Sequence, residues 1–95
     1  MNIELSPQAV EDLKEIGRYI ARDNPRRGQS FSAEMKAHCL RLIDMPGQGV
    51  ARGRISSDLR MVPYKNYLIF YRVNKTVLRI ERFLHSARDI DFDNL

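Results

Sequence analysis

Two cap-and-proline pairs constrain the first half of this 95-residue chain more than any other feature. In Ser6-Pro7 and in Asn24-Pro25, a side-chain oxygen that can cap a helix precedes a proline, which fits the first helical position. Apolar residues at helical spacing follow each pair and predict helices over about 7–22 and 26–45. Because so few residues separate them, the two helices must form an antiparallel hairpin.

The apolar stripes of these helices predict their buried faces. The stripes are Ala9, Leu13, Ile16 and Ile20 in the first helix, and Phe31, Met35, His38, Leu42 and Met45 in the second. Gly17 interrupts the first helix at a cost of about 1 kcal/mol, which a close approach of the two helices would offset. We interpret His38 as a histidine at the edge of the core rather than a ligand, and Cys39 as a small buried residue.

From Leu59 onward the composition becomes that of β-strands. Segments rich in β-branched, aromatic and aliphatic residues occupy 59–64, 67–73 and 76–84, and the short run Asn-Ile-Glu-Leu at residues 2–5 could form a further strand. The predicted fold class is α+β, in the order β-α-α-β-β-β. An N-terminal strand and an antiparallel helical hairpin pack on an antiparallel sheet, and residues 1–95 form a single domain.

Two-residue turns at Lys65-Asn66 and Asn74-Lys75 would set the register of the sheet. Tyr71 would then lie opposite Leu78, and Ile69 opposite both Ile80 and Val62. The other face would carry Met61, Leu68, Phe70, Val77 and Phe83, together with Arg72, Arg79 and Glu81. Since the helices cover only one face, we expect the other to display a mixed apolar and basic surface typical of protein interfaces.

Charge is distributed unevenly along the chain. Residues 1–24 carry three basic and five acidic groups, whereas residues 46–88 carry nine basic and two acidic groups, a net +7. Such a stretch indicates an acidic partner, either nucleic acid or an anionic protein segment. Cys39 is the only cysteine, which excludes an intramolecular disulfide and favours a reducing cytoplasm. With no signal peptide and no membrane-spanning run, we expect a soluble, cytoplasmic protein with no membrane partner.

Few side chains suggest catalysis. His85 could act as a general acid or base, and Arg88 could hold a phosphate, but a single imidazole makes only half of a proton-transfer mechanism. In the structural alternative, His85 ends a strand and Arg88 pairs with Asp89 or another carboxylate. A phosphate-binding surface could combine Arg60, Lys65, Arg72, Arg79 and Arg82. Strand alternation separates these cations, with Arg60 and Arg82 on the face of Tyr71, and Arg72 and Arg79 on the other. No metal-binding or cofactor-binding motif is present in the sequence.

Taken together, the order and spacing of several short strings resemble the ParE family of toxins, within the ParE/RelE superfamily. These strings span residues 3–90: Ser6-Pro7, Asp12-Leu13, Tyr19-Ile20-Ala21, Asn24-Pro25, Leu42 with Pro46 and Gly49, Leu59-Arg60, Tyr67-x-Ile69-x-Tyr71-Arg72-Val73, and His85-x-Ala87-Arg88-Asp89. The resemblance implies a toxin of a bacterial type II toxin–antitoxin module. Such a toxin is not an enzyme, inhibits DNA gyrase, and is neutralised by the C-terminal segment of a ParD-like antitoxin.

The sister RelE branch, whose members are ribosome-dependent mRNA endonucleases with the same fold, is the alternative. An inactive module that only binds an antitoxin is a third reading. RelE toxins commonly carry a tyrosine or another catalytic group near the C-terminus, whereas the residues after Arg88 include no Lys, Arg, His or Tyr. This departure argues against nuclease chemistry. We therefore expect no catalytic residue, no cofactor and no sequence-specific DNA binding. The candidate contact residues for partners are Arg60, Arg79, His85 and Arg88.

Overall fold

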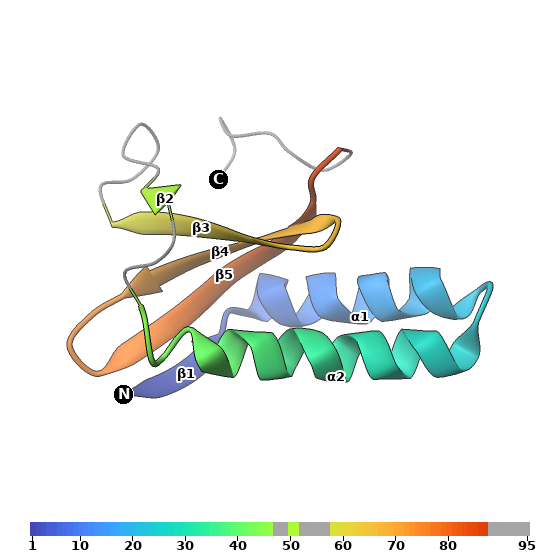
Figure 1. Ribbon diagram of the computed structural model, residues 1–95, viewed down its shortest axis with the longest axis horizontal. Coiled ribbons are helices and arrows are strands. Elements are labelled where there is room, and N and C mark those ends of the chain that lie inside the picture. Colours follow the sequence, from blue (N-terminus) through green and yellow to red (C-terminus); the bar gives the residue numbers. More distant parts are fainter. Residues whose placement is uncertain (47–49, 52–57, 88–95) are drawn as a thin grey trace.

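A computed structural model describes residues 1–46, 50–51 and 58–87 of the protein. Its elements follow in the order β1 (Asn2–Leu5), α1 (Pro7–Ala21), α2 (Pro25–Arg41), β2 (Val50–Ala51), β3 (Leu59–Tyr64), β4 (Tyr67–Val73) and β5 (Val77–His85). Figure 1 shows the helices as a hairpin on one face of the sheet. The predicted α+β class and the order of the predicted elements are confirmed.

The sheet has the strand order β1-β5-β4-β3-β2. Strands β2 to β5 pair antiparallel with their neighbours, whereas β1 pairs parallel with β5. The sheet is therefore mixed rather than purely antiparallel. The two-residue strand β2, which pairs with Met61 and Arg60 of β3, was not predicted.

Both helices begin as predicted. The Ser6 hydroxyl accepts a hydrogen bond from the Ala9 N–H at 3.0 Å and donates to the carbonyl of Glu81 at 2.7 Å. Asn24 caps α2 by accepting from the Arg27 N–H at 3.1 Å. Ser6 therefore both starts α1 and fixes that start to β5.

The two helices approach closely where glycines face each other. A Cβ built on Gly17 would lie 3.0 Å from Ser32 Oγ, and one built on Gly28 would lie 2.6 Å from the carbonyl oxygen of Gly17. The close approach expected at Gly17 is confirmed. Gly28 is the tighter of the two positions and the sequence analysis did not single it out.

The second helix ends earlier than predicted. Leu42, Ile43 and Asp44 donate their backbone N–H groups three residues back, to Cys39, Leu40 and Arg41, so the chain leaves α2 through a tighter turn. Leu42 is still fully buried, but Met45, expected in the apolar stripe, is 65% exposed. The prediction for Met45 is wrong because the helix that would have turned it inward has already ended.

The register of β4 and β5 differs from the prediction. Val62 does lie opposite Ile69, but Tyr71 lies opposite Ile80 and Ile69 opposite Phe83. Two features cause the shift. The side-chain oxygen of Asn74 accepts from the N–H groups of Thr76 and Val77, which lengthens the turn, and a bulge interrupts the pairing between Phe70 and Tyr71.

The main core lies between the helices and the sheet. It contains buried residues from both: Ala9, Leu13, Ile16, Phe31, Met35, Cys39, Leu42, Tyr67, Ile69, Tyr71, Leu78, Ile80 and Phe83. Tyr71 is fully buried and its hydroxyl donates to the carbonyl of Pro46 at 2.9 Å. Phe83, predicted on the opposite face, belongs to this core because of the bulge.

The face of the sheet away from the helices carries a second apolar cluster. Leu59, Phe70 and Leu84 are buried there, with Met61 and Leu68 packed against them. The prediction that this face exposes its apolar residues is therefore wrong at its centre. Among the described residues, the large hydrophobic side chains that are exposed lie elsewhere: Met1, Val10, Tyr19, Leu40 and Met45.

Candidate partner-binding surface

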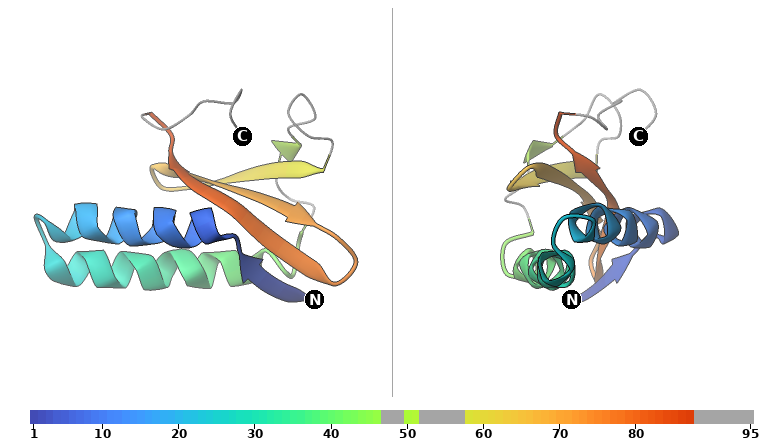
Figure 2. Two further views of the ribbon diagram at one scale, coloured as in Figure 1. Left: turned by 180° about the vertical axis from the view of Figure 1, so that it is seen from behind. Right: turned by 90° about the vertical axis from the view of Figure 1, so that its right-hand side faces the viewer.

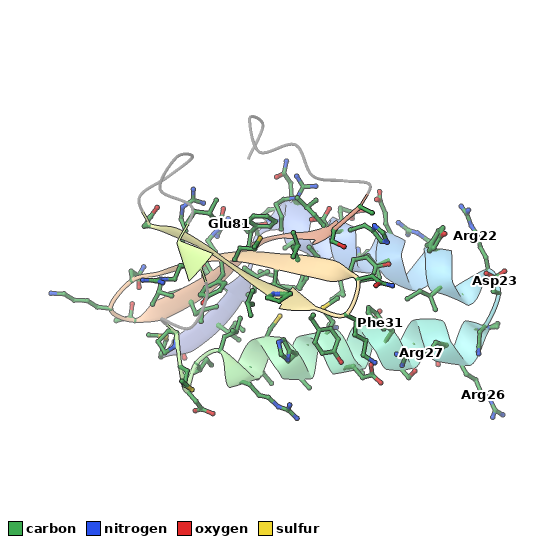
Figure 3. All side chains as sticks on the ribbon, turned by 45° about the horizontal axis from the view of Figure 1, so that its top comes forward. Arg22, Asp23, Arg26, Arg27, Phe31 and Glu81 are labelled. Carbon is green, nitrogen blue, oxygen red and sulfur yellow. The ribbon has the colours of Figure 1, made fainter. Side chains whose placement is uncertain are left out.

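Two arginines lie directly opposite each other on β4 and β5. Arg72 pairs in register with Arg79, an arrangement of like charges that is unfavourable on its own. Glu81, labelled in Figure 3, lies within 3.1 Å of Arg72 Nη1 and 2.8 Å of Arg79 Nε. Asp58 contacts Arg72 at 3.1 Å and Glu4 contacts Arg79 at 2.9 Å. The two guanidinium groups are thus bound by three carboxylates of the chain itself.

The hydrogen bond with Glu4 is the main reason that the pKa of Arg79 is raised. Glu4 lies on β1, which pairs with the part of β5 that carries Arg79. The acidic N-terminal segment therefore neutralises part of the basic second half. The predicted contact residue Arg79 is held inside an intramolecular network, although its side chain stays 42% exposed.

Arg82 is also bound within the protein, by α1. Its Nε and Nη2 atoms donate to the two carboxylate oxygens of Asp12 at 2.7 and 3.0 Å. Asp12 Oδ2 also accepts from the Phe83 N–H at 3.0 Å. Phe83 follows Ile80, the last residue of β5 that pairs with β1. The bulge places Arg82 opposite Phe70, so its expected position on the face of Tyr71 is wrong.

Arg60 lies on β3 opposite Tyr71, and therefore on the other face of the sheet from Arg79. The separation of Arg60 from Arg72 and Arg79 that strand alternation predicts is confirmed. The structure does not bring Arg60 and Arg79 together into one site.

His85 ends β5, as the structural alternative expects. Its Nδ1 atom accepts from the Ala87 N–H at 3.1 Å, and its ring meets Tyr67 edge-on at 5.3 Å. Six residues separate His85 from Arg79 along the strand, or about 20 Å. Arg88 and its expected pairing with Asp89 lie outside the described residues.

A second charged cluster joins α2 to the turn between β3 and β4. Glu34 accepts from Arg27 at 2.8 and 3.2 Å, accepts from the Tyr64 hydroxyl at 3.3 Å, and lies 3.7 Å from Lys65 Nζ. The hydrogen bonds with Arg27 are the main reason that the pKa of Glu34 is lowered, and they raise the pKa of Arg27. This cluster ties the helical hairpin to the sheet.

His38 and Cys39 occupy the structural roles expected of them. The His38 ring lies 4.5 Å from the Tyr64 ring, and its Nε2 atom is buried without a hydrogen-bond partner. Burial, followed by the charge of Arg41, lowers the pKa of His38. Cys39 is buried, which raises the pKa of its thiol to about 12.

The part of the chain that the structure describes holds no group of three or more His, Cys, Asp or Glu residues that could bind a metal ion. Within those same residues, neither helix is both long and apolar enough to cross a bilayer.

The structure singles out a cationic region that the sequence analysis missed. Arg18, Arg22 and Arg26 are exposed around the connection between α1 and α2, and none of them forms an ion pair with another described residue. The signal in the sequence was present, since residues 18–27 carry four arginines and one acid. It was overlooked because the larger charge excess lies in residues 46–88.

Comparison with known proteins agrees with this architecture. A family model described as the ParE toxin of the type II toxin-antitoxin system, parDE, matches residues 3–90. A solved structure described as the chromosomal ParDE TA system from P. aeruginosa has a TM-score of 0.75 at 18% identity, over 90% of this chain and 95% of that chain. That likeness shows a common fold. No curated protein matches the sequence. Because the family model extends from β1 to beyond the end of β5, the chain belongs to the ParE toxin family.

Proposed function

We propose that this member of the ParE family acts as a toxin by inhibiting DNA gyrase, and that a ParD-like antitoxin neutralises it. The family match over residues 3–90 is the observation that carries this proposal. The toxin would act in the cytoplasm, where it would arrest growth when the antitoxin is lost. A module of this kind stabilises a plasmid that carries it.

We further propose that the toxin inhibits its target by binding and uses no catalytic residue or cofactor. Cleavage of RNA through its 2'-hydroxyl would need proton-transfer groups and cations that converge on one phosphate. Arg60 and Arg79 lie on opposite faces of the sheet, and His85 is engaged by Ala87 at the far end of β5. This separation supports binding rather than a RelE-like nuclease.

Antitoxin recognition would use Arg60, Arg79, His85 and Arg88, and Arg60 and Arg79 would act as separate contacts because they lie on opposite faces of the sheet. Arg79 already holds two carboxylates, from Glu4 and Glu81, at hydrogen-bonding distance. An acidic antitoxin segment would therefore have to replace internal carboxylates there. Such an exchange contributes more to specificity than to affinity.

Two assays with the purified protein test the proposed target. The protein should block gyrase supercoiling or accumulate cleaved DNA, and it should leave ribosome-bound mRNA intact. Site-specific mRNA cleavage at the ribosome that is lost in Arg60→Gln or His85→Gln would identify a RelE-like nuclease instead. Normal growth on induction, with tight binding of the antitoxin, would identify an inactive module.

A further inference from the structure

The end of the helical hairpin carries positive charge that no described carboxylate neutralises. Between residues 18 and 27, Asp23 is the only acid. Arg27 is bound by Glu34 at 2.8 Å, whereas Arg18, Arg22 and Arg26 have no ion-pair partner within the described part of the chain. These three arginines and Asp23 leave a net charge of +2 on exposed side chains.

The position of Arg26 is unfavourable for folding alone. Arg26 and Arg27 occupy the first turn of α2, where the helix dipole favours acidic residues, and that turn contains none. Arg27 is compensated by Glu34 and by the Phe31 ring, 5.1 Å from its guanidinium carbon. Among the residues that the structure describes, no carboxylate or ring compensates Arg26 in this way. Positions that break a local rule are often functional sites, so Arg26 is a candidate contact for a partner.

The hairpin end also projects from the body of the protein. Figures 1 and 2 show both helices extending past the sheet toward their connection. In Figure 3, Arg22 and Arg26 point away from the protein on either side of that connection. Arg18 and Arg22 follow each other by one turn of α1, a rise of about 6 Å. Tyr19, 52% exposed, lies beside them, with the Arg22 guanidinium 6.0 Å from its ring.

We propose that this hairpin end binds the phosphate backbone of duplex DNA, independently of base sequence. A peptide that binds by adding a strand needs a free sheet edge, whereas the hairpin end consists of helices α1 and α2 and their connection. Duplex DNA presents its phosphates outward, where projecting arginines reach them. The inference does not depend on gyrase as the target, because it concerns a direct contact with DNA.

If Arg18, Arg22 and Arg26 each contact one phosphate, the salt dependence of DNA binding can be calculated. The logarithm of the association constant should fall with the logarithm of salt concentration with a slope of about −2.7. Raising salt from about 50 to 200 mM should then weaken binding about forty-fold. Each arginine that is removed should reduce the slope by about 0.9.

Fluorescence anisotropy of a labelled 20-base-pair duplex, titrated with the full chain, tests the proposal. R18Q, R22Q, R26Q and the triple variant should weaken binding in steps, and the triple variant should lose nearly all salt dependence. R41Q is the matched control, because Arg41 is an exposed arginine at the opposite end of the same helix. It should bind DNA as the wild type does. Thermal denaturation of each variant establishes that it is folded.

Three results would overturn the proposal. The first is an absence of DNA binding by the wild type at low salt. R41Q could weaken binding as much as R26Q, which would indicate a response to net charge alone. The third is binding of a poly-glutamate peptide, but not of DNA, to the wild type, with loss of peptide binding in the triple variant. This result would indicate that the hairpin end binds an acidic protein surface.

Discussion

Arginines in two regions of this protein differ in whether they form ion pairs with described carboxylates of the same chain. On β4 and β5, Arg72, Arg79 and Arg82 each donate their Nε atom to a carboxylate at 2.7 to 3.1 Å. At the end of the hairpin, Arg22 and Arg26 extend outward without a described ion pair. Three arginines of the most basic stretch of the sequence are therefore bound by carboxylates, and the fold brings two of these, Glu4 and Asp12, from the N-terminal segment.

Truncation of the core beneath the sheet should give the largest loss of stability. Tyr71→Ala should lower the free energy of unfolding by about 2–5 kcal/mol, because Tyr71 is fully buried between the sheet and the helices. Tyr71→Phe, which keeps the ring and removes the hydroxyl that donates to Pro46, should lose about 0.5–1.5 kcal/mol. Urea denaturation measures both. If Tyr71→Ala unfolded at the same urea concentration as the wild type, the Tyr71 ring would lie outside the core.

Removal of a carboxylate that neutralises the sheet should have the next largest effect. Asp12→Ala should lower the free energy of unfolding by about 1.5–3 kcal/mol, because it removes the carboxylate that accepts from both the Arg82 guanidinium and the Phe83 N–H. Glu11→Ala, at an exposed neighbouring position, is the matched control and should change stability by less than about 0.5 kcal/mol. Equal losses in the two variants would contradict a specific role for Asp12.

Glu81→Gln tests the pair of like charges on the sheet. This substitution leaves Arg72 opposite Arg79 without the carboxylate that contacts both, so stability should fall by about 0.5–1 kcal/mol. The loss should shrink at high salt, which screens the repulsion. An unchanged denaturation midpoint at low salt would show that Glu4 and Asp58 are sufficient partners.

Acidic pH should weaken the contact between α2 and the sheet through His38. The pKa of His38 is lowered in the folded state, so the unfolded state binds the proton more readily. The contribution of neutral His38 to the free energy of unfolding is complete above about pH 6.5. It is lost as the pH falls through the lower pKa that His38 has in the folded state. His38→Phe keeps a ring against Tyr64 and should reduce the loss of stability between pH 7.5 and 5.5. An identical pH profile for both proteins would rule out this role.

The arginines of the hairpin end should contribute almost nothing to folding. The triple variant R18Q/R22Q/R26Q should unfold within about 0.5 kcal/mol of the wild type, because these side chains are exposed and make no described ion pair. A loss comparable to that of Asp12→Ala would remove the distinction between the two regions.

Local chemistry explains which parts of the fold the sequence could predict. Helix starts at Ser6 and Asn24 depend on residues three positions away, so the sequence is sufficient to place them. The turn at Lys65-Asn66 is equally local, and β3 and β4 pair as expected. Past Asn74, its side-chain hydrogen bonds and the bulge at Phe70 shift the register, and alternation alone gives no signal of either.

Long-range ion pairs could not be deduced from spacing. Asp12 and Arg82 are 70 residues apart in sequence, and only the packing of α1 beside β5 brings them together. The net charge of +7 in residues 46–88 indicated an acidic partner, which the sequence analysis took to be another molecule. The fold supplies much of that partner internally, which is why the predicted contact residue Arg79 is partly occupied.

Nitrogen-15 NMR of the arginine side chains would test the contrast between the two regions most directly. The Nε–Hε groups of Arg72, Arg79 and Arg82 donate to carboxylates, so they should give dispersed signals that exchange slowly with water. Those of Arg18, Arg22 and Arg26 should be averaged and exchange rapidly until duplex DNA is added, when they alone should shift. Averaged signals from the sheet arginines, or DNA-induced shifts confined to them, would contradict the account.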